Sequence, residues 1–193
     1  MLLSKGFADA LIYASQAHGD QVKKGTGIPY IAHLLGVAAI TLEYGGSETE
    51  AIGALLHDVV EDCGGAPRLR EIRDRFGEAV ARIVDGCTDT DDTPKPPWRE
   101  RKEKYIAHLD SADASTLLVS ASDKLYNTRT ILRDLRREGD QAFEKFNGKK
   151  QGRLWYYRAL VNAFRHRPES NAELIDELDR VVTKIESIVS DRP

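Results

Sequence analysis

Residues 47–62 are SETEAIGALLHDVVED, and this stretch carries the clearest structural signal in the chain. Ser47 and Glu50 match a capping box, in which the serine accepts a hydrogen bond from the backbone of the fourth residue and the glutamate reaches back to the serine. An apolar run from Ala51 to Val60 follows directly. Because a capping box opens a helix, we predict one helix that starts here and continues through this run.

The rest of the chain shows the same helical period. We find no sustained alternation of apolar and polar residues and no Asn-Gly hairpin signal. Residues 19–27 are polar and contain glycine, and residues 89–97 contain three prolines, so both segments are predicted loops. The remaining predicted helices cover residues 4–18, 29–44, 98–109, 113–138, 140–164 and 169–190. A short helix is also predicted from Pro67, and a further one from Gly77 to about Gly86. The pattern predicts an all-α fold, a helical bundle that forms one domain over residues 1–193.

Composition narrows the class of protein. The chain has 193 residues, of which 41% are hydrophobic and 31% are charged, so an ordered domain is expected. No apolar run approaches the ~20 residues that span a bilayer. The first ten residues carry Lys5 and Asp9 and lack the apolar core of a signal peptide. We therefore predict a cytoplasmic protein with no membrane partner.

Charge and cysteine content exclude further classes. The net charge is −3, which argues against a nucleic-acid polymer as partner, because binding to such polymers relies on a basic surface. Cys63 and Cys87 are far apart and form no CxxC pair, so neither a disulfide framework nor a cysteine metal site is expected. The oligomeric state stays open.

The segment His57-Asp58-Val59-Val60-Glu61-Asp62 brings an imidazole and three carboxylates onto an otherwise apolar helix. On a continuous helix of ~100° per residue, these four side chains lie within a sector of about 140°. Groups crowded in this way repel one another unless a cation lies among them, because buried charge is costly when it is unpaired. Their donor atoms suit manganese, iron or magnesium.

Two other predicted helices offer matching residues. His33 lies in apolar company, and Asp123 lies deep in a long helix with Asn127 one turn further on. Taken alone, a histidine of this kind is more often a hydrogen-bonded core residue, and Asp123 could pair with a nearby Lys or Arg. The order His…His-Asp…Asp across three helices is far more specific than any single member.

That order resembles the signature of the HD phosphohydrolase superfamily. Within it, three segments resemble motifs of the RelA/SpoT-type alarmone hydrolases: QVKKGTGIPYIAH at 21–33, LLHDVVED at 55–62 and DKLYNTR at 123–129. Residues 73–86, with Phe76-Gly77 and Val84-Asp85-Gly86, resemble their connecting segment. The resemblance covers residues 5 to about 135. The remaining residues are too few for a synthetase or regulatory domain, so the match is to the stand-alone small hydrolases.

The resemblance implies a role for each matching residue. It implies that His33, His57, Asp58 and Asp123 bind one Mn²⁺, that Glu61 and Asp62 orient and deprotonate the attacking water, and that Asn127 contacts the ligand or the surroundings of the metal. Lys23 or Lys24 would lie beside the nucleotide base. This chain has Lys-Lys where the family often has Arg-Lys, an extra residue before Pro29, and Leu34 where proline is common. The first two departures leave open which lysine meets the substrate.

The expected function is hydrolysis of the 3′-pyrophosphate of the guanosine alarmones (p)ppGpp, a small-molecule nucleotide substrate, with release of pyrophosphate. The same reaction on the adenosine alarmones (p)ppApp is the main alternative. Another HD enzyme, a nucleotidase or cyclic-nucleotide phosphodiesterase, is disfavoured by the glycine-lysine loop and by Asp-Lys-Leu-Tyr-Asn. A non-catalytic binding module is disfavoured because all four ligands and both acids are present.

Three further features have two interpretations each. The basic clusters at 99–104 and 149–158 are weak candidates for binding the distal phosphates, and a solvated helix face is the stronger interpretation. Trp155-Tyr156-Tyr157 could stack a purine, although aromatic residues at helical spacing are more often core. His18 recurs in the opening motif of the family, and we expect a structural role for it.

Overall fold

The structure is a computed structural model that describes residues 3–90 and 94–191. Within these residues the chain is helical apart from its loops and an isolated bridge between Val22 and Pro29, which confirms the predicted all-α fold. In the described part of the chain, no helix is long and apolar enough to span a membrane. The elements are α1 (Lys5–His18), α2 (Ile31–Glu43), α3 (Glu48–Leu56), α4 (Val59–Cys63), α5 (Ala66–Phe76), α6 (Glu78–Cys87), α7 (Trp98–His108), α8 (Ala114–Glu138), the 3-10 helix η1 (Gly139–Phe143), α9 (Lys149–Arg165) and α10 (Ala172–Ser190).

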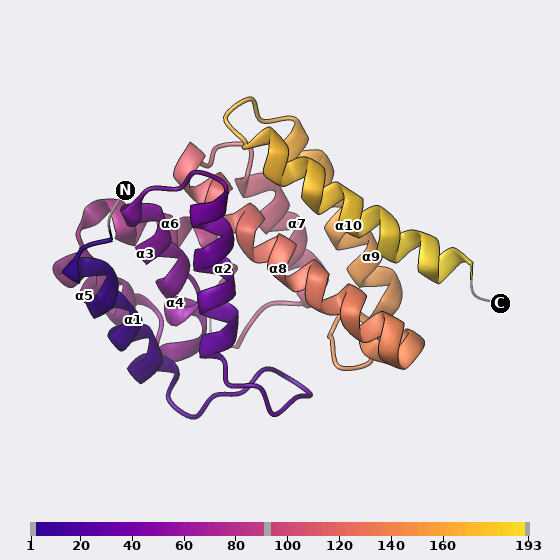
Figure 1. Ribbon diagram of the computed structural model, residues 1–193, viewed down its shortest axis with the longest axis horizontal. Coiled ribbons are helices and arrows are strands. Elements are labelled where there is room, and N and C mark those ends of the chain that lie inside the picture. Colours follow the sequence, from indigo (N-terminus) through magenta and orange to yellow (C-terminus); the bar gives the residue numbers. More distant parts are fainter. Residues whose placement is uncertain (1–2, 91–93, 192–193) are drawn as a thin grey trace.

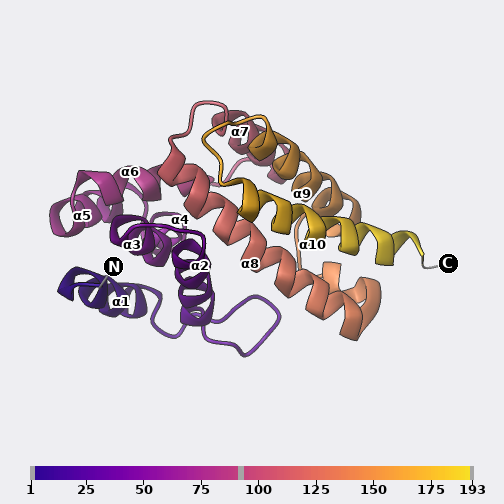
Figure 2. The ribbon, with the colours of Figure 1, turned by 45° about the horizontal axis from the view of Figure 1, so that its top comes forward.

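The long helix α8 divides the fold into two groups of helices. It packs against α2, α3 and α6 on one side and against η1, α9 and α10 on the other (Figures 1 and 2). Each side has its own hydrophobic cluster: α8 contributes Val119 to the first and Leu118 and Leu125 to the second. Tyr126 packs against both clusters. A residue on α8 can therefore meet residues from both halves of the chain.

The capping box is present, but the helix that follows it is shorter than predicted. The Ser47 hydroxyl accepts from the Glu50 backbone, and the Glu50 carboxylate accepts from the Ser47 backbone. However, α3 ends at Leu56, and α4 begins only at Val59. The prediction of one continuous helix through residue 60 was wrong, because Asp58 has a ψ of −5° and does not continue the helical ladder.

Three other predicted boundaries also differ from the structure. The expected helix 140–164 is divided into η1 and α9, and Lys149 at the start of α9 has a φ of +48°. The helix predicted from Pro29 begins at Ile31, and the one predicted from 169 begins after the cap Asn171. The loop predicted at 89–97 is confirmed for its described residues, and 91–93 lie outside the described residues.

The loop between α1 and α2 doubles back on itself (Figure 1). The backbone N–H of Lys23 donates to the carbonyl of Ile28, and that of Tyr30 donates to the carbonyl of Gln21. Gly25 lies at the tip with a φ of +73° and packs against Lys145. The loop thus carries Lys23 to Tyr126 and Thr130 of α8 and Lys24 to Asn147, in the segment that precedes α9.

Gly36 is where α2 crosses α8, and Gly36→Ala is expected to destabilise the fold by about 1–3 kcal/mol. A Cβ at this position would lie 2.1 Å from Cε2 of Tyr126, so the ring would have to move. The gain in helix propensity from alanine, about 1 kcal/mol, opposes this effect only in part. Urea denaturation measures the difference. Gly27→Ala is the control, because no heavy atom lies within 4 Å of its Cβ position. Equal midpoints for Gly36→Ala and the native protein would contradict the prediction.

Candidate functional site

Four side chains from three parts of the chain meet at one point. His33 lies on α2, His57 and Asp58 lie in the break between α3 and α4, and Asp123 lies midway along α8. His33 Nε2 is 3.2 Å from both His57 Nε2 and Asp58 Oδ2. His57 Nε2 is 3.1 Å from Asp58 Oδ2. Asp123 Oδ1 lies 3.4 Å from His33 Nε2 and 3.8 Å from His57 Nε2. The predicted ligands therefore converge on one centre.

His57 and Asp58 lie next to each other at the break between α3 and α4. Both keep backbone angles in the right-handed helical region, and both side chains reach His33. Two adjacent residues thus contribute one donor each to the same centre.

The protonation of His57 favours metal binding. Its Nδ1 lies 2.8 Å from the carbonyl oxygen of Ala54. Because a carbonyl only accepts, Nδ1 carries a proton, and Nε2 is the ring nitrogen that faces the cluster. Burial opposes a charge on this imidazole, yet the carboxylates of Asp58 and Asp123 raise the pKa of His57 well above its ordinary value. A cation at the centre would take the place of that second proton. The donor set fits a divalent first-row metal ion.

Each candidate ligand carboxylate is also held by a second side chain. The Tyr30 hydroxyl donates to Asp58 Oδ2 at 2.6 Å. Lys124 Nζ donates to Asp123 Oδ2, and Asn127 Nδ2 donates to Asp123 Oδ1, both at 2.5 Å. Partners of this kind fix the orientation of metal ligands. The spacing of Asn127 predicted its place beside Asp123, and a pair between Asp123 and a nearby Lys or Arg was the other interpretation of this aspartate. The contact of Tyr30 with Asp58 was not predicted.

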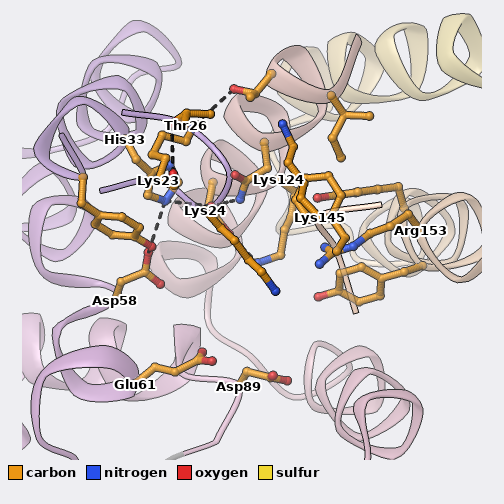
Figure 3. A pocket seen from close by; sticks show the side chains of 18 of the residues that line it. Lys23, Lys24, Thr26, His33, Asp58, Glu61, Asp89, Lys124, Lys145 and Arg153 are labelled. Atoms are coloured by element: carbon orange, nitrogen blue, oxygen red, sulfur yellow. Dashed lines mark hydrogen bonds and ion pairs between the residues drawn. The ribbon is translucent and has the colours of Figure 1, made fainter. Parts of the chain in front are cut away.

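A cavity of about 290 Å³ opens beside the cluster. This volume is close to the lower end of the ~300–1,000 Å³ typical of small-molecule sites. Figure 3 shows Asp58 and Glu61 on one side of the space and Lys145 and Arg153 on the other. The cationic side chains in its wall are Lys23, Lys24, Lys102, Lys124, Arg133, Lys145 and Arg153. A wall of this charge suits a ligand with several phosphate groups.

A family model for the HD domain matches residues 10–153, which include all four members of the cluster. The chain belongs to the HD domain family. The matched residues end within α9, so the assignment of the whole range 1–193 to one HD domain stays a prediction.

Relatives and solved structures agree with this assignment. The HD domain is 41% identical over 124 residues to the guanosine-3′,5′-bis(diphosphate) 3′-pyrophosphohydrolase MESH1 of Danio rerio, an alignment that covers 63% of this chain and 66% of the relative. It is 35% identical over 119 residues to the guanosine-3′,5′-bis(diphosphate) 3′-pyrophosphohydrolase of Aquifex aeolicus, covering 62% of this chain but only 17% of that longer protein. The solved structure of a metazoan orthologue of SpoT that hydrolyses ppGpp superposes with a TM-score of 0.77 at 26% identity, over 96% of this chain and 98% of that one.

The two predicted acids of the HD domain differ in position. Glu61 lines the cavity, and its carboxylate accepts from Lys95 Nζ at 2.9 Å. Asp62 is not part of the cavity wall; its Oδ2 accepts from Gln21 Nε2 at 3.1 Å. Burial and the nearby Asp58 raise the pKa of Asp62. The geometry therefore favours Glu61 as the acid that faces a bound ligand.

Both predicted lysines reach the cavity of the HD domain. Lys23 Nζ lies 4.5 Å from the centre of the Tyr126 ring, and burial, together with Arg133, lowers the pKa of Lys23. Lys24 Nζ lies 3.5 Å from Oδ1 of Asn147, which lies between η1 and α9. Lys23 is the more deeply placed of the two, next to the ring that also packs on His33.

Some residues that line the cavity of the HD domain were not predicted from the sequence, and others were only weak candidates for phosphate binding. Lys102 and Arg153 come from the two basic clusters for which a solvated face was the stronger interpretation. Lys145 lies outside both clusters, and nothing in the sequence marks it. Tyr156 and Tyr157 are buried and also line the cavity, so the core interpretation and the site interpretation both apply to them.

Proposed function

We propose that this protein hydrolyses the 3′-pyrophosphate of the guanosine alarmones (p)ppGpp and releases pyrophosphate, and that its cofactor is one Mn²⁺ held by His33, His57, Asp58 and Asp123. The observation that carries the proposal is the opening of this histidine-aspartate cluster onto a cavity with a cationic wall. The names of the Danio and Aquifex relatives and the activity of the SpoT orthologue support it. The cytoplasmic location expected from the sequence stays a prediction.

The reaction needs a nucleophile, a proton acceptor and charge neutralisation. Water attacks the phosphorus bound to the 3′ oxygen, the bond between that phosphorus and the 3′ oxygen breaks, and the 3′ oxygen leaves as an alcohol. When bound, the divalent cation polarises the phosphoryl oxygens and makes water more acidic. Glu61 is the proton acceptor, because its carboxylate lies in the cavity wall beside Asp58.

The cationic wall neutralises the phosphates that do not react. Lys102 Nζ pairs with Asp89 at 2.9 Å, and Lys145 Nζ pairs with Asp134 at 2.5 Å, so both ammonium groups are held in place before a ligand arrives. Cations held in this way lose little freedom when they meet an anion, which strengthens their contribution. Lys23 and Lys24, on the loop, also line this space.

The pKa of Lys102 predicts a pH dependence of substrate binding. Burial, together with the nearby Lys124, lowers this pKa to about 7. The side chain is cationic below that value and neutral above it. We therefore expect the KM for ppGpp to rise about tenfold from about pH 6 to about pH 8.5, as a charge-assisted contact is lost. The variant Lys102→Arg, which stays charged, should show a much flatter profile.

Steady-state kinetics of the two proteins across this range measure the effect. The substrate phosphates titrate equally in both assays, so only the difference between the two profiles reports on Lys102. Parallel profiles for the native protein and Lys102→Arg would contradict the assignment.

The proposed function is tested by product analysis with purified protein and Mn²⁺, with ppGpp and ppApp offered separately. Release of pyrophosphate and GDP from ppGpp is the expected result. Release of pyrophosphate and ADP from ppApp alone would transfer the reaction to adenosine alarmones. Turnover of ordinary nucleotides alone would indicate another HD phosphohydrolase, and tight binding without turnover would indicate a binding module.

A further inference from the structure

His18, the last residue of α1, connects to the site without lining the cavity. Its side chain is buried, with 5% of the residue exposed, and its ring stacks on that of Tyr30 with the centres 4.8 Å apart. Its Nδ1 lies 2.8 Å from Gln21 Oε1. The amide nitrogen of Gln21 in turn donates to Asp62 Oδ2 at 3.1 Å. A line of polar contacts therefore runs from α1 through the loop to α4.

The chemistry of the three groups fixes the direction of this line. The Asp62 carboxylate can only accept, so the amide nitrogen of Gln21 faces it and the amide oxygen faces His18. An amide oxygen also only accepts, so Nδ1 of His18 carries the proton. The other ring nitrogen, Nε2, is buried and has no hydrogen-bond partner, as expected when it is the unprotonated one. His18 thus sets the orientation of Gln21, and Gln21 holds Asp62.

The element at the end of this line is short. Helix α4 has five residues, Val59–Cys63, and a helix of this length is not stable by itself. It carries Glu61, which faces the cavity, and Asp62, which does not. Cys63, on the same helix, has its Sγ 3.6 Å from His18 Nδ1. Val59 and Val60 bury α4 in the core, and the contacts with His18 and Gln21 tie its exposed side to the loop.

We propose that His18 and Gln21 are positioning residues, which hold α4 through Asp62 and so keep Glu61 directed at the bound nucleotide. The inference rests on the proposed function. It assigns Asp62 to the support of Glu61 rather than to contact with the substrate. The same loop presents Lys23 and Lys24, so this line joins the substrate-facing loop to the helix that carries the proton acceptor.

The variants Gln21→Met and His18→Phe test the proposal. Methionine keeps the length of glutamine but cannot hold Asp62, and phenylalanine keeps the stack on Tyr30 but cannot hold Gln21. Each is expected to lower kcat for ppGpp about tenfold, the order of one lost hydrogen bond. KM and the Kd for Mn²⁺ should change by less than about threefold, because neither side chain lines the cavity or hydrogen-bonds a candidate metal ligand. The backbone hydrogen bonds of Gln21 with His18 and Tyr30 remain and keep the loop in place.

The double variant is the decisive measurement. Because both residues act through one line, His18→Phe with Gln21→Met should lower kcat no further than either change alone, whereas independent effects would multiply. Gln16→Met, at an exposed position of α1, is the control. In the native protein, ¹⁵N shifts of His18 should show the proton on Nδ1.

Each other outcome overturns the inference in a recognisable way. If the native protein turns over ppGpp but kcat is unchanged in both single variants, or the two losses multiply, the positioning role is wrong and the proposed function stands. A neutral His18 with its proton on Nε2 could not donate from Nδ1 to Gln21, and this result would also contradict the inference. A native protein without turnover on ppGpp would overturn the proposed function and this inference together. Thermal denaturation of each variant shows whether it is folded at the assay temperature.

Discussion

Glu61→Gln is expected to lower kcat for ppGpp by about 10²–10⁴-fold while Mn²⁺ still binds. Glu61 lies in the cavity wall but is not one of the four residues that converge on the candidate metal centre. Glutamine has the same shape, and its oxygen can still accept from Lys95, which pairs with Glu61 at 2.9 Å. It cannot take a proton from water. The kinetics of the variant and calorimetric titration with Mn²⁺ measure the two properties separately.

Glu103→Gln is the matched control, because Glu103 is an exposed glutamate that pairs with Arg99 on α7. It should retain native kcat. A Glu61→Gln enzyme with full activity would remove Glu61 from its role as proton acceptor, and one that had lost Mn²⁺ would place it among the ligands.

His57→Ala is expected to lower kcat for ppGpp by at least about 10³-fold, because a catalytic metal ion contributes several kcal/mol to stabilisation of the transition state. His57 Nε2 lies within 3.2 Å of His33 Nε2 and 3.1 Å of Asp58 Oδ2, at the centre of the donor set. With alanine at this position, three of the four candidate metal ligands remain, and the Ala54 carbonyl loses its hydrogen bond from His57 Nδ1. Calorimetry should show much weaker Mn²⁺ binding, and addition of EDTA to the native enzyme should reproduce the loss of activity.

His108→Ala provides the comparison, since His108 is an exposed histidine at the end of α7. It should bind Mn²⁺ and turn over ppGpp like the native protein. Native affinity for Mn²⁺ in His57→Ala, with a native circular dichroism spectrum, would show that the metal lies elsewhere.

Much of this fold follows from local residue patterns. The capping box at Ser47 and the helical period predicted the start of α3 and most other helices, because these signals depend on residues within one or two turns. The prolines between 94 and 97 predicted the loop before α7 for the same reason. Local signals failed within the helix predicted over 140–164, where η1 ends at Phe143 and Lys149 has a positive φ angle.

The four members of the candidate metal centre were identified from residue type and order. Charged and imidazole groups in apolar helices need a compensating partner, and this need can be recognised without coordinates. The sequence also predicted that Asn127 lies beside Asp123, because residues four apart share one face of a helix.

Contacts between segments far apart in the chain could not be predicted in this way. The meeting of His33 with His57 and Asp58, the hydroxyl of Tyr30 on Asp58, and the line from His18 to Asp62 all join separate elements. The same holds for Lys145, which reaches the cavity only because η1 and the segment before α9 fold back against α8. A single sequence shows which groups need partners, because charge and hydrophobicity belong to each residue and its neighbours in the chain. Which partner each group meets depends on how the helices pack across α8, and that is a property of the tertiary structure alone.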